Sequence, residues 1–149
     1  MPTNILRKAA DQRTAQVQSG RRKGAASRHA LLTVAGVSIR IVLAETATAD
    51  LIWRALPLHS TAETWGRCVH FEVPLETGRD RTARINGVKG EIYFWVEDDR
   101  IMVPFGPTPI SRPGEWRLPS PANVWAHTVD DVSVLGRVRP GVKVSLVAA

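Results

Sequence analysis

Short apolar runs separated by turn residues dominate the pattern of hydrophobic and polar positions along this chain. The first two runs, residues 31–34 and 37–43, are rich in aliphatic and β-branched residues and are separated by Ala35-Gly36. This arrangement predicts two strands joined by a tight turn. In the second run apolar residues occupy every second position, which is the period of a strand with one buried face.

The same alternation recurs in residues 67–73 and predicts a half-buried strand with His70 on its polar face. Two apolar runs, 91–96 and 100–105, flank the polar stretch Glu97-Asp98-Asp99, so we expect a hairpin there. The prolines between residues 111 and 121 argue against regular structure in that segment. The last two strands are expected at residues 123–128 and 142–147.

The clearest helix is predicted over residues 49–56. Thr48 is placed to cap its N-terminus, Asp50 lies in its first turn, and Pro57 ends it. A single helical turn is expected near residues 130–135. Many short strands with one main helix indicate a mainly β fold, a closed or nearly closed barrel.

Composition and length indicate one domain with an uneven charge. The 149 residues carry a formal net charge of +6, with 44% hydrophobic and 23% charged residues. Residues 1–29 hold seven of the 20 basic residues and one of the 14 acidic residues, which leaves 13 of each for residues 30–149. We therefore expect a basic, disordered tail before a neutral domain at 30–149, and no specific nucleic-acid binding.

A targeting signal does not explain the first apolar stretches better than two short strands do. Arg21-Arg22 precedes the apolar stretch 30–37, which raises the hypothesis of a twin-arginine export signal, but Gly36 and Arg40 interrupt the apolar region. No run approaches the ~18 apolar residues of a membrane span. Cys68 is the only cysteine, so the sequence predicts no internal disulfide, no thiolate zinc site and a cytoplasmic location.

Several motifs occur in a specific order. They are Leu56-Pro57, Trp65-Gly66, Gly90-Glu91-Ile92-Tyr93-Phe94-Trp95, Phe105-Gly106-Pro107-Thr108-Pro109-Ile110-Ser111 and Ala122-Asn123-Val124. Over about residues 30–147 this order resembles the small prokaryotic cyclophilin-like domains of unknown function. The resemblance implies a single closed eight-stranded cyclophilin-like β-barrel capped by a helix. It also implies a concave face lined by the regions of Trp65, Trp95 and Phe105.

The chain departs from the pattern of these domains at three places. After Trp-Gly it reads Arg67-Cys68-Val69-His70-Phe71, after Trp95 it reads Val96-Glu97-Asp98-Asp99, and after Val124 it reads Trp125-Ala126. The first departure replaces an acidic segment of the family pattern, and the second replaces a Pro-Pro-Gly turn. We expect the shape and charge near Arg67 and His70 to differ from those of relatives.

One enzyme hypothesis is prolyl isomerisation, because true cyclophilins present an arginine from a barrel strand beside a hydrophobic proline pocket. Arg40, Arg67 or Arg100 could supply such an arginine. However, the chain contains no Arg-Ile-Pro followed by Phe-Met and a Gln-Gly-Gly segment. The sequence therefore lacks the signature that surrounds the catalytic arginine.

A second enzyme hypothesis is an isomerase or lyase for a small metabolite, with Arg67 or His70 as the polar catalyst. His70 and His127 are the histidines inside predicted strands, and Cys68 projects to the same strand face as His70. The alternation favours a solvated His70, whereas a lone cysteine is more often buried. Four scattered histidines without matching carboxylates predict no metal site, and no cofactor is implied.

The aromatic residues give the strongest functional signal. Five tryptophans are present, and four of them lie near loops that contain glycine or proline. We expect an aromatic-lined groove that binds a small molecule or a peptide. Its predicted wall consists of Trp65, Tyr93, Trp95, Phe105 and Thr108, with Asn123 as a polar orienting group. An interaction module that uses exposed strand edges remains a third hypothesis.

Overall fold

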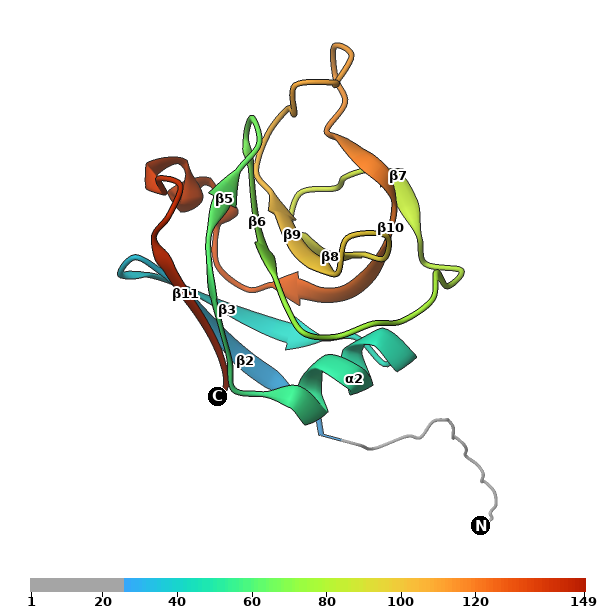
Figure 1. Cartoon of the computed structure of the whole chain (residues 1–149), viewed down its shortest axis with the longest axis vertical. Helices are drawn as coiled ribbons and strands as arrows, with labels where there is room; N and C mark the ends of the chain where they lie inside the picture. Colours follow the sequence, from blue (N-terminus) through green and yellow to red (C-terminus); the bar gives the residue numbers. More distant parts are fainter. Residues whose placement is uncertain (1–25) are drawn as a thin grey trace.

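The computed structural model describes residues 26–149, which form a curled β-sheet with a helix across one end (Figure 1). Of the predicted tail, residues 1–25 lie outside the described residues, and the first described strand begins at His29. The strands are β2 His29–Val34, β3 Val37–Leu43, β4 Leu58–Thr61, β5 Glu63–Thr64, β6 Cys68–Glu72, β7 Arg84–Asn86, β8 Glu91–Trp95, β9 Arg100–Pro104, β10 Arg117–Thr128 and β11 Lys143–Ala148. The helices are α2 Ala47–Ala55 and the 3-10 helix η1 Val132–Arg137.

The described residues form one ten-stranded sheet in the order β4-β11-β2-β3-β10-β8-β9-β6-β5, with β7 paired to β10. A mainly β fold with one main helix is confirmed, but a closed eight-stranded barrel is not. The sheet stays open because β4 and β5 pair with different strands, β11 and β6. The chain changes partner at Ala62, whose N–H donates to the Val142 carbonyl over 2.8 Å.

The predicted hairpins are present, because their turn residues adopt the required conformations. Between β2 and β3, Ala35 and Gly36 have φ values of 50° and 83°, as a two-residue turn of type I′ requires. Between β8 and β9, Asp99 has a φ of 53°, and the Asp98 N–H donates to the Trp95 carbonyl over 3.3 Å. Both strand pairs are antiparallel.

Helix α2 begins two residues earlier than predicted. The Thr46 hydroxyl, rather than that of Thr48, caps the helix by accepting a hydrogen bond from the Ala49 N–H over 3.1 Å. Thr48 lies inside the helix on its buried face with Ala49 and Ile52. The predicted helical turn near residues 130–135 is confirmed as η1, whose Val132 and Leu135 are buried.

Strand β10 is longer than predicted. It begins at Arg117 and continues through Pro119 and Pro121, where the sequence argued against regular structure. In this stretch β10 pairs only loosely with the short strand β7, with an irregular register between Arg117 and Ala122. A proline there removes no essential ladder hydrogen bond.

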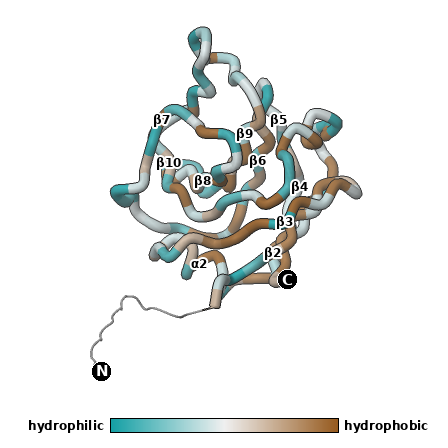
Figure 2. Tube along the Cα trace, turned by 180° about the vertical axis from the view of Figure 1, so that it is seen from behind, coloured by the Kyte–Doolittle hydropathy of each residue, from teal (hydrophilic) through white to brown (hydrophobic). Residues whose placement is uncertain are grey.

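Two hydrophobic clusters lie on opposite faces of the strands β6, β8 and β9. Along β8, Ile92 and Phe94 belong to the main core, whereas Tyr93 belongs to the second cluster. Leu118 and Ala122 of β10 also belong to this second cluster. In Figure 2 hydrophobic residues follow strands such as β3, and hydrophilic residues gather at the tip of the loop after β9. The prediction that β6 is only half-buried is wrong at Cys68, which is fully buried in the second cluster.

Candidate functional site

A groove of about 340 Å³ lies on the face of β6 and β9 that carries the second cluster. We call it the aromatic groove. Two tryptophans line it, together with a methionine, a proline and three polar side chains, and its residues are Trp65, His70, Trp95, Asp98, Arg100, Met102 and Pro119. This volume is within the range of small-molecule sites.

The strand register explains which side chains meet in the aromatic groove. Met102 on β9 lies opposite His70 on β6 and opposite Tyr93 on β8. One step along the sheet, Arg100 lies opposite Trp95. Because side chains alternate between the faces of a strand, these residues project to one side. Trp65 joins them from the turn between β5 and β6, where its N–H donates to the Cys68 carbonyl over 2.9 Å.

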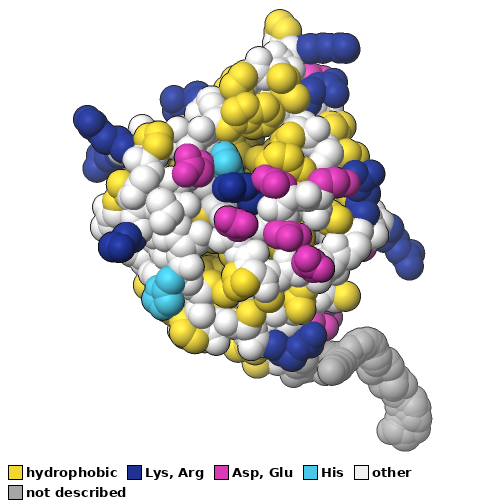
Figure 3. Space-filling view, viewed as in Figure 1, with side chains coloured by type: hydrophobic (Ala, Val, Ile, Leu, Met, Phe, Trp, Pro, Cys, Tyr) yellow, Lys and Arg dark blue, Asp and Glu magenta, His cyan; other side chains and the backbone are white. Residues whose placement is uncertain are grey.

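The polar end of the groove is a short network around Arg100. Its Nε donates to Asp98 Oδ2 over 2.8 Å, and one terminal nitrogen lies 3.3 Å from His70 Nδ1. Arginine can only donate, so Nδ1 accepts, and we infer that His70 is neutral with its proton on Nε2. Figure 3 shows a histidine beside a basic side chain at the foot of a hydrophobic hollow, with acidic side chains around them.

The environment of His70 lowers its pKa below the ordinary histidine value. Burial is the main cause, and the positive charge of Arg100 is the second. The nearby carboxylates Glu63 and Asp98 act in the opposite direction but do not reverse the shift. The groove therefore presents a neutral imidazole near physiological pH.

This pKa shift predicts a pH dependence of folding. Native His70 binds a proton less readily than unfolded His70, so its stabilising contribution is complete above about pH 6.5. That contribution declines as the pH falls from there towards the native pKa. NMR titration of the His70 ring measures that pKa, and replacing Arg100→Met should raise it. An unchanged pKa in the variant would contradict the electrostatic role of the guanidinium group.

The structure brings three predicted site residues into the aromatic groove, namely Trp65, His70 and Trp95. Tyr93 lies beneath the groove and is fully buried. Its hydroxyl donates to Glu91 Oε1 over 2.6 Å and accepts from the Val88 N–H over 2.7 Å. Burial and the Glu91 contact raise the Tyr93 pKa well above its usual value. Tyr93 therefore supports the groove floor and does not line it.

Other predicted site residues lie outside the aromatic groove. Phe105 packs against the main core, and the Arg67 guanidinium lies 4.8 Å from the centre of its ring. The buried Thr108 hydroxyl bonds to the Ser111 side chain and to the Arg117 carbonyl, which fixes the loop after β9. Arg67 and His70, paired in the enzyme hypothesis, therefore do not line the same groove.

Asn123 is fully buried and has protein partners for both ends of its amide. Its nitrogen donates to Thr48 Oγ1 over 3.1 Å and to the Gly78 carbonyl over 2.9 Å. Its oxygen accepts from the Asp80 N–H over 2.9 Å. This amide connects β10 to α2 and to the loop before β7, and it does not reach the aromatic groove.

The surroundings of the remaining candidate catalytic residues indicate structural roles. Burial raises the pKa of the Cys68 thiol to about 12, so it is not a thiolate at neutral pH. Arg40 forms a two-point ion pair with Asp130, at 2.7 and 3.1 Å. His127 Nε2 lies 3.8 Å from Glu91 on the neighbouring strand. Of the three arginines considered for isomerase chemistry, only Arg100 lines the aromatic groove.

Five lining residues were not in the predicted wall, namely His70, Asp98, Arg100, Met102 and Pro119. Met102 and Arg100 share the face of Trp95 in the predicted hairpin, so its strand register could have identified them. Pro119 carries no such signal, because its strand was not predicted. Within residues 26–149 no cluster of His, Cys, Asp and Glu has metal-binding geometry. In the same residues, no helix combines the length and hydropathy needed to cross a membrane.

The family model for cyclophilin-like proteins matches residues 29–147. The chain therefore belongs to the cyclophilin-like family. No match was found among the curated proteins.

Two solved structures share the fold. The hypothetical protein AF2241 from Archaeoglobus fulgidus aligns with a TM-score of 0.72 and 24% identity, over 89% of this chain and 100% of that chain. McbB, solved in complex with tryptophan, aligns with a TM-score of 0.61 and 17% identity, over 79% of this chain and 44% of that chain. At these identities the likeness establishes the fold alone.

Proposed function

We propose that the aromatic groove binds the flat, apolar group of a small organic molecule or of a peptide side chain. The observation that carries this proposal is the pair of tryptophans, Trp65 and Trp95, which line one hollow whose floor includes Met102. Both indoles pack against the second cluster yet remain partly exposed. An indole in this setting offers a large apolar surface to a ligand at little conformational cost.

The polar end of the groove defines what else the ligand should carry. The inferred proton on His70 Nε2 and the Arg100 guanidinium are both hydrogen-bond donors. Asp98 is paired with Arg100, and Glu63 lies opposite His70 on β5, so no net positive charge is left to hold a carboxylate, and two hydrogen-bond donors do not suit a cation. A neutral carbonyl oxygen therefore suits this end better than a carboxylate or a cation. The proposed ligand is a ring with a carbonyl acceptor.

The experiment uses the indole NMR signals of the full chain as reporters. Aromatic amino acids and their amides are suitable first probes, because the structural neighbour McbB was solved with tryptophan. Flat heteroaromatic compounds and proline-containing peptides complete the panel. We expect binding to shift the indole signals of Trp65 and Trp95 but not that of Trp53 on α2.

Replacing Trp65→Ala or Trp95→Ala should weaken binding of a positive probe roughly 30-fold, because truncating an anchoring aromatic residue costs ~2 kcal/mol or more. Trp53→Ala is the matched control, since Trp53 is a partly buried tryptophan on α2, beside Arg28 and outside the groove. The control should leave the Kd unchanged. A probe that binds both groove variants as tightly as the unmodified chain would refute the proposed site.

Prolyl isomerisation is the second candidate, favoured by the position of Arg100 on β9 beside Met102 and Trp65. An arginine that donates to the carbonyl or imide nitrogen of a proline substrate could lower the barrier to rotation. In this chain, however, the guanidinium already contacts Asp98 and His70. A standard assay with a proline peptide tests the candidate. Activity that is lost in Arg100→Ala and retained in Arg40→Ala would support it, whereas equal rates would exclude Arg100 as the catalyst.

A further inference from the structure

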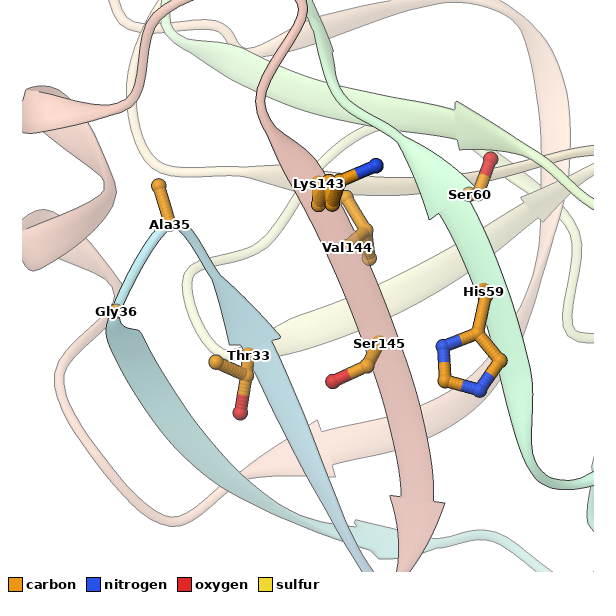
Figure 4. A pocket seen from close by; sticks show the side chains of 8 residues that line it. All are labelled: Thr33, Ala35, Gly36, His59, Ser60, Lys143, Val144 and Ser145. Atoms are coloured by element: carbon orange, nitrogen blue, oxygen red, sulfur yellow. The ribbon is translucent and has the colours of Figure 1, made fainter.

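A second hollow, of about 430 Å³, lies on the outer face of β4, β11 and β2 (Figure 4). We call it the polar hollow. Its lining combines side chains that donate hydrogen bonds with the turn between β2 and β3, and its residues are Thr33, Ala35, Gly36, His59, Ser60, Lys143, Val144 and Ser145. It shares no lining residue with the aromatic groove.

Strand register places the donors of the polar hollow side by side. Ser145 on β11 lies opposite His59 on β4 and opposite Thr33 on β2. Lys143 is two residues before Ser145 and therefore projects to the same face. In Figure 4 the Lys143 side chain extends from β11 towards Ser60 on β4, and His59 lies beside Ser145. A cation, an imidazole and a hydroxyl thus lie on the same face of two adjacent strands.

These donors have no protein partner among the described residues. Within residues 26–149 Lys143 takes part in none of the ion pairs, and neither Ser145 Oγ nor the His59 ring makes a hydrogen bond. By contrast, Thr33 bonds to Ser38 over 3.0 Å, and Ser60 donates to the Glu72 carbonyl over 2.6 Å. No carboxylate lines the hollow. The hollow is therefore rich in donors and carries positive charge, which suits an anion.

We propose that the polar hollow binds the phosphoryl group of a small phosphate monoester. Lys143 supplies the charge, and Ser145 and His59, which are register partners on the neighbouring strands, supply further donors. A tetrahedral phosphate offers three acceptor oxygens and close to two negative charges, whereas a planar carboxylate offers two oxygens and one charge. The hollow is larger than a phosphate ion, and the space beside Thr33 and the Ala35-Gly36 turn accommodates the organic part.

Titration of the ¹⁵N-labelled full chain with glycerol phosphate and, separately, with inorganic phosphate tests this proposal. We expect saturable shifts of the backbone signals of His59, Lys143 and Ser145. Lys143→Ala should weaken glycerol phosphate binding at least ~10-fold, which is about 1.4 kcal/mol. Lys89→Ala is the matched control, because it removes the same charge from an exposed lysine outside the hollow. The control should change the Kd by less than about twofold.

Three results would overturn the proposal. The first is that the signals of His59, Lys143 and Ser145 show no saturable shift, whether or not signals of residues 1–25 move. The second is an equal loss of affinity in Lys143→Ala and Lys89→Ala. The third is equal affinity for inorganic phosphate and glycerol phosphate, which would assign the hollow to a free anion rather than to a monoester. An unchanged Tm in Lys143→Ala confirms that the variant is folded.

Discussion

Replacing Gly66→Ala is expected to lower the free energy of unfolding by about 3 kcal/mol, combining backbone strain with a steric clash. Gly66 has a φ of +58°, a conformation that L side chains rarely adopt. A Cβ atom there would lie 2.7 Å from Pro109 Cδ and 2.9 Å from Thr108 Cα. One of these atoms belongs to the backbone and the other to a rigid ring, so the loop after β9 must move as a whole.

Gly36→Ala is the matched control for this prediction, because Gly36 also has a positive φ, +83°, but its Cβ would meet nothing within 4 Å. The control should lose only ~1–2 kcal/mol, the conformational part of the effect. Urea unfolding of both variants measures the two losses. Equal losses would show that the loop accommodates the methyl group and that close packing at Gly66 is unimportant. Since Trp65 precedes Gly66, we also expect Gly66→Ala to weaken binding in the aromatic groove.

Asn123→Ala is expected to cost about 3 kcal/mol of folding free energy, because it removes three hydrogen bonds of a fully buried amide at roughly 1 kcal/mol each. The Asp80 N–H loses its acceptor, and the Gly78 carbonyl and the Thr48 hydroxyl lose their donor. Because Asn123 is fully buried, water cannot replace the amide without a rearrangement. Urea unfolding should show a lower midpoint.

Two comparisons make the Asn123 prediction specific. Asn86→Ala, on the exposed part of β7, should change stability by less than about 0.5 kcal/mol. Thr48→Val removes only one of the three partners, so its cost should be smaller than that of Asn123→Ala. An Asn123→Ala variant as stable as Asn86→Ala would mean that the loop around residues 78–80 is not anchored through this amide.

Features that depend on neighbouring residues in the chain were predictable from the sequence. The β2–β3 hairpin follows from alternating apolar residues and from Ala35-Gly36, whose conformations match the turn. The helix was predicted, but its start was misplaced by two residues, because Thr46 and Thr48 are both good caps and only the packed structure distinguishes them. Strand β10 was shortened in the prediction because prolines usually exclude a strand, and only its loose pairing with β7 makes them acceptable.

The candidate site depended on what covers each strand face, and alternation alone does not encode this. Alternation places Cys68, His70, Tyr93 and Trp95 on the strand face away from the main core. If nothing packs against that face, it is exposed to solvent. The structure covers part of that face with Leu118 and the other members of the second cluster, so Cys68 and Tyr93 are fully buried. His70 and Trp95 stay partly open at its edge and line the aromatic groove.

Local residue order is enough to predict the strand alternation, the main helix, the turns and the resemblance to cyclophilin-like domains. Which side chains come into contact depends on the tertiary structure. Arg100 and His70 are 30 residues apart, and the antiparallel register of β6 and β9 brings them within hydrogen-bond distance. In the same way, the pairing of β4 with β11 places His59 in one hollow with Lys143 and Ser145. Long-range pairing fixes such contacts because a shift of one residue would move each side chain to the opposite face.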